Sequence, residues 1–79
     1  MAELQTTLHD IAAAIVDSPD EVKVIREEDE TTITLTLTVA PDDMGMVIGR
    51  HGRIAKAIRT VIKAASAECG KRVNVEIRD

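Results

Sequence analysis

Strict alternation of threonine with aliphatic residues from position 31 to position 39 most constrains the fold of this chain. The aliphatic members of the pattern are Ile33, Leu35, Leu37 and Val39. Because successive side chains of a strand point to opposite faces, this spacing places all four on one face and the threonines on the other. The segment therefore predicts a half-buried β-strand over residues 31–39, with its threonine face turned outward.

Helical periodicity flanks this strand on both sides. Apolar residues recur at intervals of three or four from residue 4 to residue 15, and Pro19 ends that pattern. A second amphipathic pattern follows later, and its apolar members are Ile54, Ile58, Val61, Ile62 and Ala65. Gly70 is the expected C-terminal stop of this second helix. Each helix has an apolar stripe that must be covered by a sheet or another helix.

Three shorter segments complete the order of elements. Residues 21–27 and 73–78 have the pattern of strands, and residues 42–47 follow a proline as a very short helix. A strand followed by helices and then by another strand is most simply closed with the two strands parallel. We therefore predict an α+β fold of order α-β-β-α-α-β, in which three helices cover one face of a three-stranded mixed sheet.

Composition narrows the classes of function. The 79 residues suffice for one domain, residues 1–79, with one modest core. Phe, Tyr and Trp are absent, so the core must be aliphatic and bases cannot stack on aromatic side chains. The single cysteine, Cys69, cannot form an internal disulfide, and no apolar run approaches the roughly 20 residues that span a bilayer. We expect a soluble cytoplasmic protein with no membrane partner.

Charge is divided unequally along the chain. The net charge is −4, yet residues 1–45 hold eleven acids and two bases, whereas residues 46–79 hold eight bases and three acids. The first part therefore carries −9 and the second +5. The local field governs the encounter with a polyanion more than net charge does. The second part is the candidate nucleic-acid surface.

A basic Gly-x-x-Gly turn opens the second long helix. Gly49 and Gly52 bracket Arg50 and His51, and the glycines allow a polyanion to approach the backbone closely. The first amides of a helix lack intrahelical partners, so we expect them to point outward toward phosphate. Basic residues then recur along the helix at Arg53, Lys56, Arg59 and Lys63. The turn and the basic row together favour a phosphate-binding surface over an ordinary solvated helix face.

The sequence lacks the residues required for other kinds of phosphate site, for a metal site or for a catalytic site. The turn has no Gly-Lys-Ser or Gly-Lys-Thr ending, and a dinucleotide site needs a longer glycine fingerprint. No nucleophile has a paired base, so we expect no enzymatic activity, no cofactor, no metal and no small-molecule substrate. His9 is expected at the surface or at the boundary of the core, Cys69 is expected to be buried or structural, and the acidic run 27–30 is expected to be a solvated loop. Met44 and Met46 either pack beneath the short helix or form a contact patch.

The run from Val47 to Ile54 resembles the signature of KH domains, in which apolar residues precede Gly-x-x-Gly and a further Ile follows it. The order of elements resembles the type II, prokaryotic arrangement of that fold. The resemblance covers essentially the whole chain, whose length and residues 43–63 are similar to the small bacterial single-KH RNA-binding proteins of the KhpA type. It implies a groove that clamps about four nucleotides of single-stranded RNA.

The resemblance also implies a set of RNA-binding residues. They form one segment and are Ile48, Gly49, Arg50, His51, Gly52, Arg53, Ile54 and Lys56. The turn clamps the backbone, the two isoleucines belong either to an aliphatic floor beneath the bases or to the core under it, and the two later cations contact flanking phosphates. Ile58 belongs either to that floor or to the core, and main-chain groups of residues 73–77 are expected to meet base edges. Met46 stands where related proteins often carry a basic residue. The missing charge weakens the electrostatic contribution expected for RNA binding.

A single module of this kind binds with modest affinity, so a second site would add avidity. The resemblance implies a homodimer, or a heterodimer with a larger KH-containing RNA-binding protein. It also implies a role as an RNA chaperone or post-transcriptional regulator. The competing hypothesis is a protein-interaction subunit whose surface mainly forms a dimer and contacts RNA weakly. The aliphatic residues near the glycine turn and the lack of aromatic side chains motivate this second hypothesis.

Overall fold

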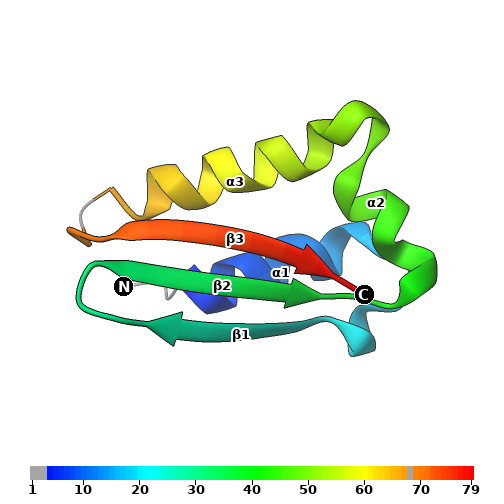
Figure 1. The fold of residues 1–79 in the computed structure, drawn as a ribbon. Helices are drawn as coiled ribbons and strands as arrows, with labels where there is room; N and C mark the ends of the chain where they lie inside the picture. The colour runs from blue at the N-terminus through cyan, green and yellow to red at the C-terminus, as the bar shows by residue number, and fades with distance from the viewer. Residues whose placement is uncertain (1–3, 68) are drawn as a thin grey trace.

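A computed structural model describes residues 4–67 and 69–79 of the chain. Its helices lie on one face of a three-stranded sheet, and the other face is open (Figure 1). The main elements are α1 (Leu4–Ile15), β1 (Lys23–Glu28), β2 (Thr32–Thr38), α2 (Met44–Ile48), α3 (Arg53–Ala65) and β3 (Arg72–Arg78). Within the described ranges, single 3₁₀ turns lie at Pro19–Glu21, Pro41–Asp43 and Arg50–Gly52. The predicted α+β fold and its order of elements are confirmed.

β2 is the central strand of the sheet. It pairs antiparallel with β1, where Thr38 lies opposite Lys23, and parallel with β3, where Thr32 lies opposite Arg72. The parallel pairing is the closure expected across two intervening helices. Alternation along β2 buries its aliphatic side chains beneath the helices, while its threonines are only half-buried. The period-two pattern therefore determines which face of the sheet the helices cover.

The core is aliphatic, as the composition requires. Its most deeply buried large side chains come from both layers and are Leu8, Leu35, Leu37, Val47 and Ile62. Full burial of one such side chain stabilises the fold by about 1.5–3 kcal/mol. Because Val47 belongs to this set, the short helix α2 is anchored directly in the core. The buried side chain of Val47 thus fixes the position at which the glycine turn begins.

α3 buries a narrower face than its apolar pattern predicts. Ile58 and Ile62 are 3% and 1% exposed, but Ile54 is 37% and Val61 is 48% exposed. α3 packs against β3, the edge strand, and against α1, so the layer beneath it covers only part of its apolar surface. The apolar periodicity of α3 is therefore wider than its buried face. Part of the apolar stripe is an exposed surface.

The C-terminal end of α3 also differs from the prediction. The helix ends at Ala65, and the Ser66 amide donates to the carbonyls of Ile62 and Lys63 at 2.9 and 3.3 Å. Gly70 lies beyond this end, in the turn before β3, where its φ of 75° falls in the left-handed region. Gly70 therefore shapes the start of β3 and does not stop the helix.

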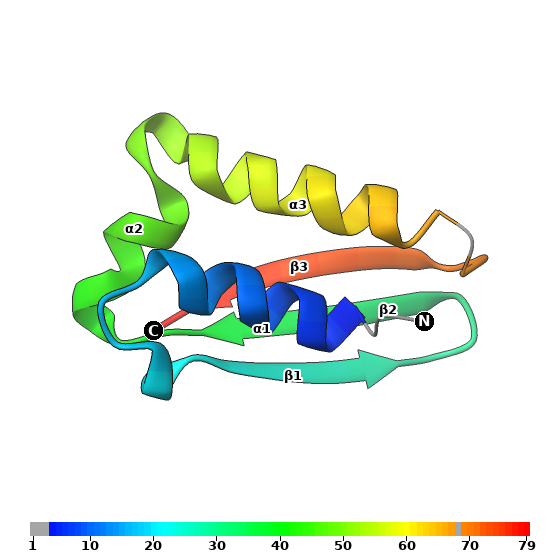
Figure 2. The same ribbon diagram turned by 180° about the vertical axis from the view of Figure 1, so that it is seen from behind.

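Asp43 joins the segment before α2 to the segment after α1. The residue is 2% exposed, and its Oδ2 accepts a 3.0 Å hydrogen bond from the backbone amide of Ser18. A buried carboxylate without such a partner would be destabilising. The bond fixes α2 at the end of the sheet, beside the C-terminal end of α1 (Figure 2).

Candidate nucleic-acid interface

The glycine turn connects α2 to α3 at one end of the sheet (Figure 1). Gly49 has φ 75° and ψ 175°, a combination that is essentially limited to glycine. A Cβ atom at Gly49 would lie 2.3 Å from Cγ1 of Ile54, so the backbone packs directly on that side chain. Gly52 has φ 75° and ψ 16°, but a Cβ atom there would meet nothing within 4 Å. Packing and conformation both require Gly49, whereas conformation alone favours Gly52.

The two residues between the glycines present basic side chains to solvent. Arg50 and His51 are both exposed. His51 adopts φ 57° and ψ 23°, a left-handed conformation that is uncommon outside glycine. Arg50–Gly52 form a tight 3₁₀ turn that displays a guanidinium and an imidazole group.

Several backbone amides of the turn are already occupied. The Gly49 amide donates to the Gly45 carbonyl at 2.9 Å, and the Gly52 amide donates to the Gly49 carbonyl at 3.2 Å. The Arg53 amide donates to the Arg50 carbonyl. The expectation that the first helical amides lack partners is wrong for Gly52 and Arg53, because a 3₁₀ turn precedes the helix. The turn thus offers fewer free main-chain donors than the sequence suggested.

Aliphatic side chains border the turn. Ile48 and Ile54 are 36% and 37% exposed, whereas Ile58, one turn farther along α3, lies in the core. The alternative that placed Ile58 in a binding floor is therefore excluded. Met46 is also exposed, while Met44 is partly buried against the core. The apolar surface at the turn consists of Ile48, Ile54 and Met46.

Basic side chains follow α3 away from the turn. Arg53, Lys56, Arg59 and Lys63 are all exposed. The Nε atom of Arg59 donates to the carbonyl oxygen of Val75 in β3 at 3.3 Å. We term the surface on either side of this bond, from Lys56 to Lys63 and along β3, the α3–β3 seam. Arg59 therefore already binds one of the main-chain carbonyls of residues 73–77, the segment expected to meet base edges.

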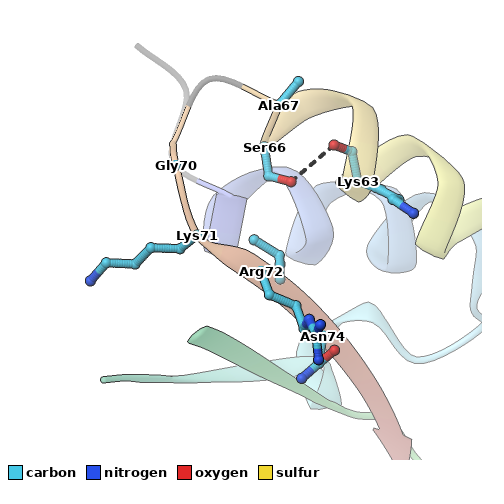
Figure 3. Close-up of a pocket in the computed structure, with 8 residues that line it drawn as sticks. Lys63, Ser66, Ala67, Gly70, Lys71, Arg72 and Asn74 are labelled. Carbon is cyan, nitrogen blue, oxygen red and sulfur yellow. Dashed lines mark hydrogen bonds between the residues drawn. The ribbon is translucent and has the colours of Figure 1, made fainter. Parts of the chain in front are cut away.

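An open pocket of about 790 Å³ lies at the end of the α3–β3 seam farthest from the glycine turn (Figure 3). Its polar lining comes from Lys63 and Ser66 at the end of α3 and from Lys71, Arg72 and Asn74 at the start of β3. Only Lys63 among them belongs to the basic row that the sequence predicts. The regular spacing that identified the basic row of α3 does not extend across the turn into β3, so their convergence depends on the fold.

An acidic cluster of the β1–β2 hairpin holds Lys71. The ammonium group donates to the carboxylate of Glu28 and, at 2.8 Å, to the carbonyl oxygen of Asp29. The hydrogen bond from Lys71 lowers the pKa of Glu28 below its ordinary value, and its charge adds to the effect. Backbone amides of Thr31 and Thr32 lower the pKa of Asp29. The acidic run 27–30 is exposed, as expected, and Glu28 and Asp29 also make contacts that shape the hairpin.

Other residues considered from the sequence lie outside these surfaces. His9 is on α1, where its Nδ1 lies 3.3 Å from Oδ1 of Asp10. Cys69 is exposed. Among residues 4–67 and 69–79, no three His, Cys, Asp or Glu side chains are grouped so that they could hold a metal ion. No helix in the described part of the chain has the length and apolar character needed to cross a membrane.

Known proteins resemble the chain over nearly its full length. The family model described as KhpA/KhpB, KH domain matches residues 5–77. RNA-binding protein KhpA of Clostridium acetobutylicum is 58% identical over 74 residues, which cover 94% of this chain and 99% of that protein. The protein of the same name in Bacillus subtilis is 46% identical over 76 residues, covering 96% and 94%. The solved structure of Era in complex with MgGDPNP and nucleotides 1506–1542 of 16S ribosomal RNA shares the fold, with a TM-score of 0.70, 16% identity, and coverage of 95% of this chain and 29% of that one.

Proposed function

The chain belongs to the KhpA/KhpB family of KH domains, and we propose that it binds single-stranded RNA at the glycine turn and the α3–β3 seam. The observation that carries this proposal is the turn itself, in which exposed Arg50 and His51 lie between two glycines of positive φ. The names of the relatives support RNA as the ligand. In this proposal residues 1–79 form one KH domain, which acts in the cytoplasm as an RNA chaperone or post-transcriptional regulator.

The turn is proposed to bind the RNA backbone. Since Gly49 and Gly52 carry no Cβ, a phosphate can come close to the main chain there. The Arg50 guanidinium and the His51 imidazole supply hydrogen bonds that are charge-assisted with a phosphate oxygen. Exposed Arg53, followed by Lys56 on α3, is positioned to meet the adjacent phosphates. Contacts of this kind give an affinity that falls with salt and discriminates little between sequences.

The bases are proposed to lie over Ile48 and Ile54. Each isoleucine has about a third of its surface available, and covering apolar area stabilises a complex by about 25 cal/mol per Å². Base edges would then reach β3, where Arg59 already binds the Val75 carbonyl. Arg59 either releases that carbonyl to a base or offers its remaining N–H groups to the same base. The proposal therefore adds Arg59 to the eight residues implied by the family resemblance.

Assembly with a second KH protein is a second candidate function. Val61 of α3 is 48% exposed, and Ile15 of α1, the helix packed beside α3, is 37% exposed. Apolar side chains left uncovered on one layer are a feature of protein interfaces. The proposed partner is a second copy of this chain or a larger KH-containing protein. Joining two weak RNA sites in this way would raise the overall affinity.

Charge reversal at the turn tests the RNA-binding proposal. The variant Arg50→Asp/His51→Asp should lose binding of a labelled single-stranded RNA in fluorescence anisotropy, with its far-UV circular dichroism unchanged. The matched control, Lys23→Asp/Arg26→Asp, makes at least as large a change in net charge at exposed positions of β1, on the opposite edge of the sheet from β3. This control should keep most of the affinity. Unchanged affinity and salt dependence in the turn variant would rule out the proposed clamp.

Sizing tests the assembly proposal. Val61→Glu places a charge on the exposed surface of α3, whereas changes at Ile58 or Ile62 would damage the core. If the surface forms the dimer, light scattering should show a dimer for the unmodified chain and a monomer for the variant. A chain that is monomeric at all accessible concentrations, or a variant that still dimerises, would contradict assembly of two copies through α3.

A further inference from the structure

The pocket at the far end of the α3–β3 seam combines two available cations with one amide. Lys63 and Arg72 line it from α3 and β3 and are both exposed. Among residues 4–67 and 69–79, neither forms an ion pair, and the Asn74 side chain makes no hydrogen bond. Arg72 and Asn74 lie together beside β3 (Figure 3). The pocket therefore presents unused donors to a ligand.

Lys71 contributes differently to this pocket. Its ammonium group points away from Arg72 and Asn74 in Figure 3 and binds Glu28 and the Asp29 carbonyl instead. Its charge is thus largely compensated by Glu28. These contacts hold the first residues of β3 against the β1–β2 hairpin. Lys71 keeps the wall of the pocket in place, while Lys63 and Arg72 supply its positive field.

The pocket continues the basic row that begins at the glycine turn. Lys63 follows Lys56 by two helical turns and Arg59 by one, so all three lie on the same side of α3. Arg59 identifies this side as the one that faces β3, through its bond to Val75. At about 1.5 Å of rise per residue, Lys63 lies about 16 Å along the helix from Gly52. A chain of phosphates that leaves the turn along this side meets cations over its whole length.

We propose that this pocket binds the nucleotides that continue a single strand beyond the segment held at the glycine turn. Lys63 and Arg72 bind the phosphodiester of the continuing strand, and the Asn74 amide, which is both donor and acceptor, pairs with a base edge. This inference rests on the proposed RNA binding. It extends the proposed site past the four nucleotides that a glycine clamp holds.

A length series of RNA separates this extension from the clamp. Anisotropy titrations would compare a 4-nucleotide and a 12-nucleotide RNA of one repeated base, across a range of salt concentrations. The variants are Lys63→Ala/Arg72→Ala and the control Lys23→Ala/Arg26→Ala, which also removes two cations but from β1, on the opposite edge of the sheet from β3. Loss of two phosphate contacts should lower the salt slope for the 12-mer by about 1.4. Between 50 and 200 mM salt, the unmodified complex should then weaken about sevenfold more than the Lys63→Ala/Arg72→Ala complex.

The expected pattern is a loss confined to the long RNA. The Lys63→Ala/Arg72→Ala variant should bind the 4-mer as the unmodified chain does, and the control should match the unmodified chain for both lengths. Asn74→Ala should lower affinity for the 12-mer without changing its salt slope. The extension alone would be overturned if the Lys63→Ala/Arg72→Ala variant lost equal affinity for both RNAs or lost none for the 12-mer. It would also be overturned if the unmodified chain bound both RNAs with equal affinity. Failure of the unmodified chain to bind either RNA would overturn the proposed function with it.

Discussion

Alanine at Gly49 and at Gly52 should have clearly different effects on stability. Both positions have a positive φ, but an added Cβ meets Cγ1 of Ile54 at 2.3 Å in the first case and nothing within 4 Å in the second. Gly52→Ala should cost about 1–2 kcal/mol, the penalty for a left-handed alanine. Gly49→Ala carries a backbone penalty of about 1–3 kcal/mol and an overpacking penalty of about 1–3 kcal/mol. Its total of about 2–6 kcal/mol makes it the more damaging change.

Thermal unfolding followed by far-UV circular dichroism measures this difference. For a domain of this size, 1 kcal/mol shifts the melting temperature by about 4–8 °C, so Gly49→Ala should melt well below Gly52→Ala. A third variant locates the cause. Ile54→Ala removes the atom nearest the added methyl group, so Gly49→Ala/Ile54→Ala should be less destabilised than the sum of its single changes. Equal melting temperatures for the two glycine variants, or strict additivity in the double variant, would refute the packing argument.

Two further predictions concern contacts remote from the turn. Asp43→Ala leaves the Ser18 amide without its partner and should lower the free energy of unfolding by about 1–3 kcal/mol in urea titrations; a variant as stable as the unmodified chain would show that this bond does not hold α2. Glu28 has a lowered pKa in the folded chain, so its pairing with Lys71 stabilises the fold at neutral pH and is lost as the pH falls through that lowered pKa. Glu28→Gln should therefore destabilise the chain at pH 7 but very little at pH 2, and an equal effect at both values would contradict the ion pair.

Local patterns in the sequence predict most of the fold. The alternation in residues 31–39 and the regular spacing in both long helices reflect burial on one side, which is a property of neighbouring residues. The parallel pairing of β2 with β3 then follows from the length of the connection between them. These features do not depend on side-chain contacts between distant residues, and for that reason the sequence alone predicts them.

Features that depend on long-range packing could not be predicted in the same way. The apolar pattern of α3 does not show that Val61 stays outside while Ile62 enters the core, because the covered width depends on where β3 and α1 lie. Likewise, Lys71 and Glu28 are 43 residues apart in the sequence. The bond from Arg59 to Val75 depends on the distance between a helix and a strand edge. At the candidate site, the order of residues identified the turn and the basic row of α3 but not the contact that joins this row to β3.

The all-aliphatic core also determines how the protein can be observed. Without Trp, Tyr or Phe, the chain contributes almost no absorbance near 280 nm and no intrinsic fluorescence. Near-ultraviolet absorbance of a purified sample would therefore report copurified nucleic acid directly. A single tryptophan introduced on the exposed surface, for example at Val61, would be a unique optical reporter. The methyl groups of Leu35, Leu37 and Ile62 fill the interior where aromatic rings would otherwise lie. Their nuclear magnetic resonance signals would therefore report on the packing of the core.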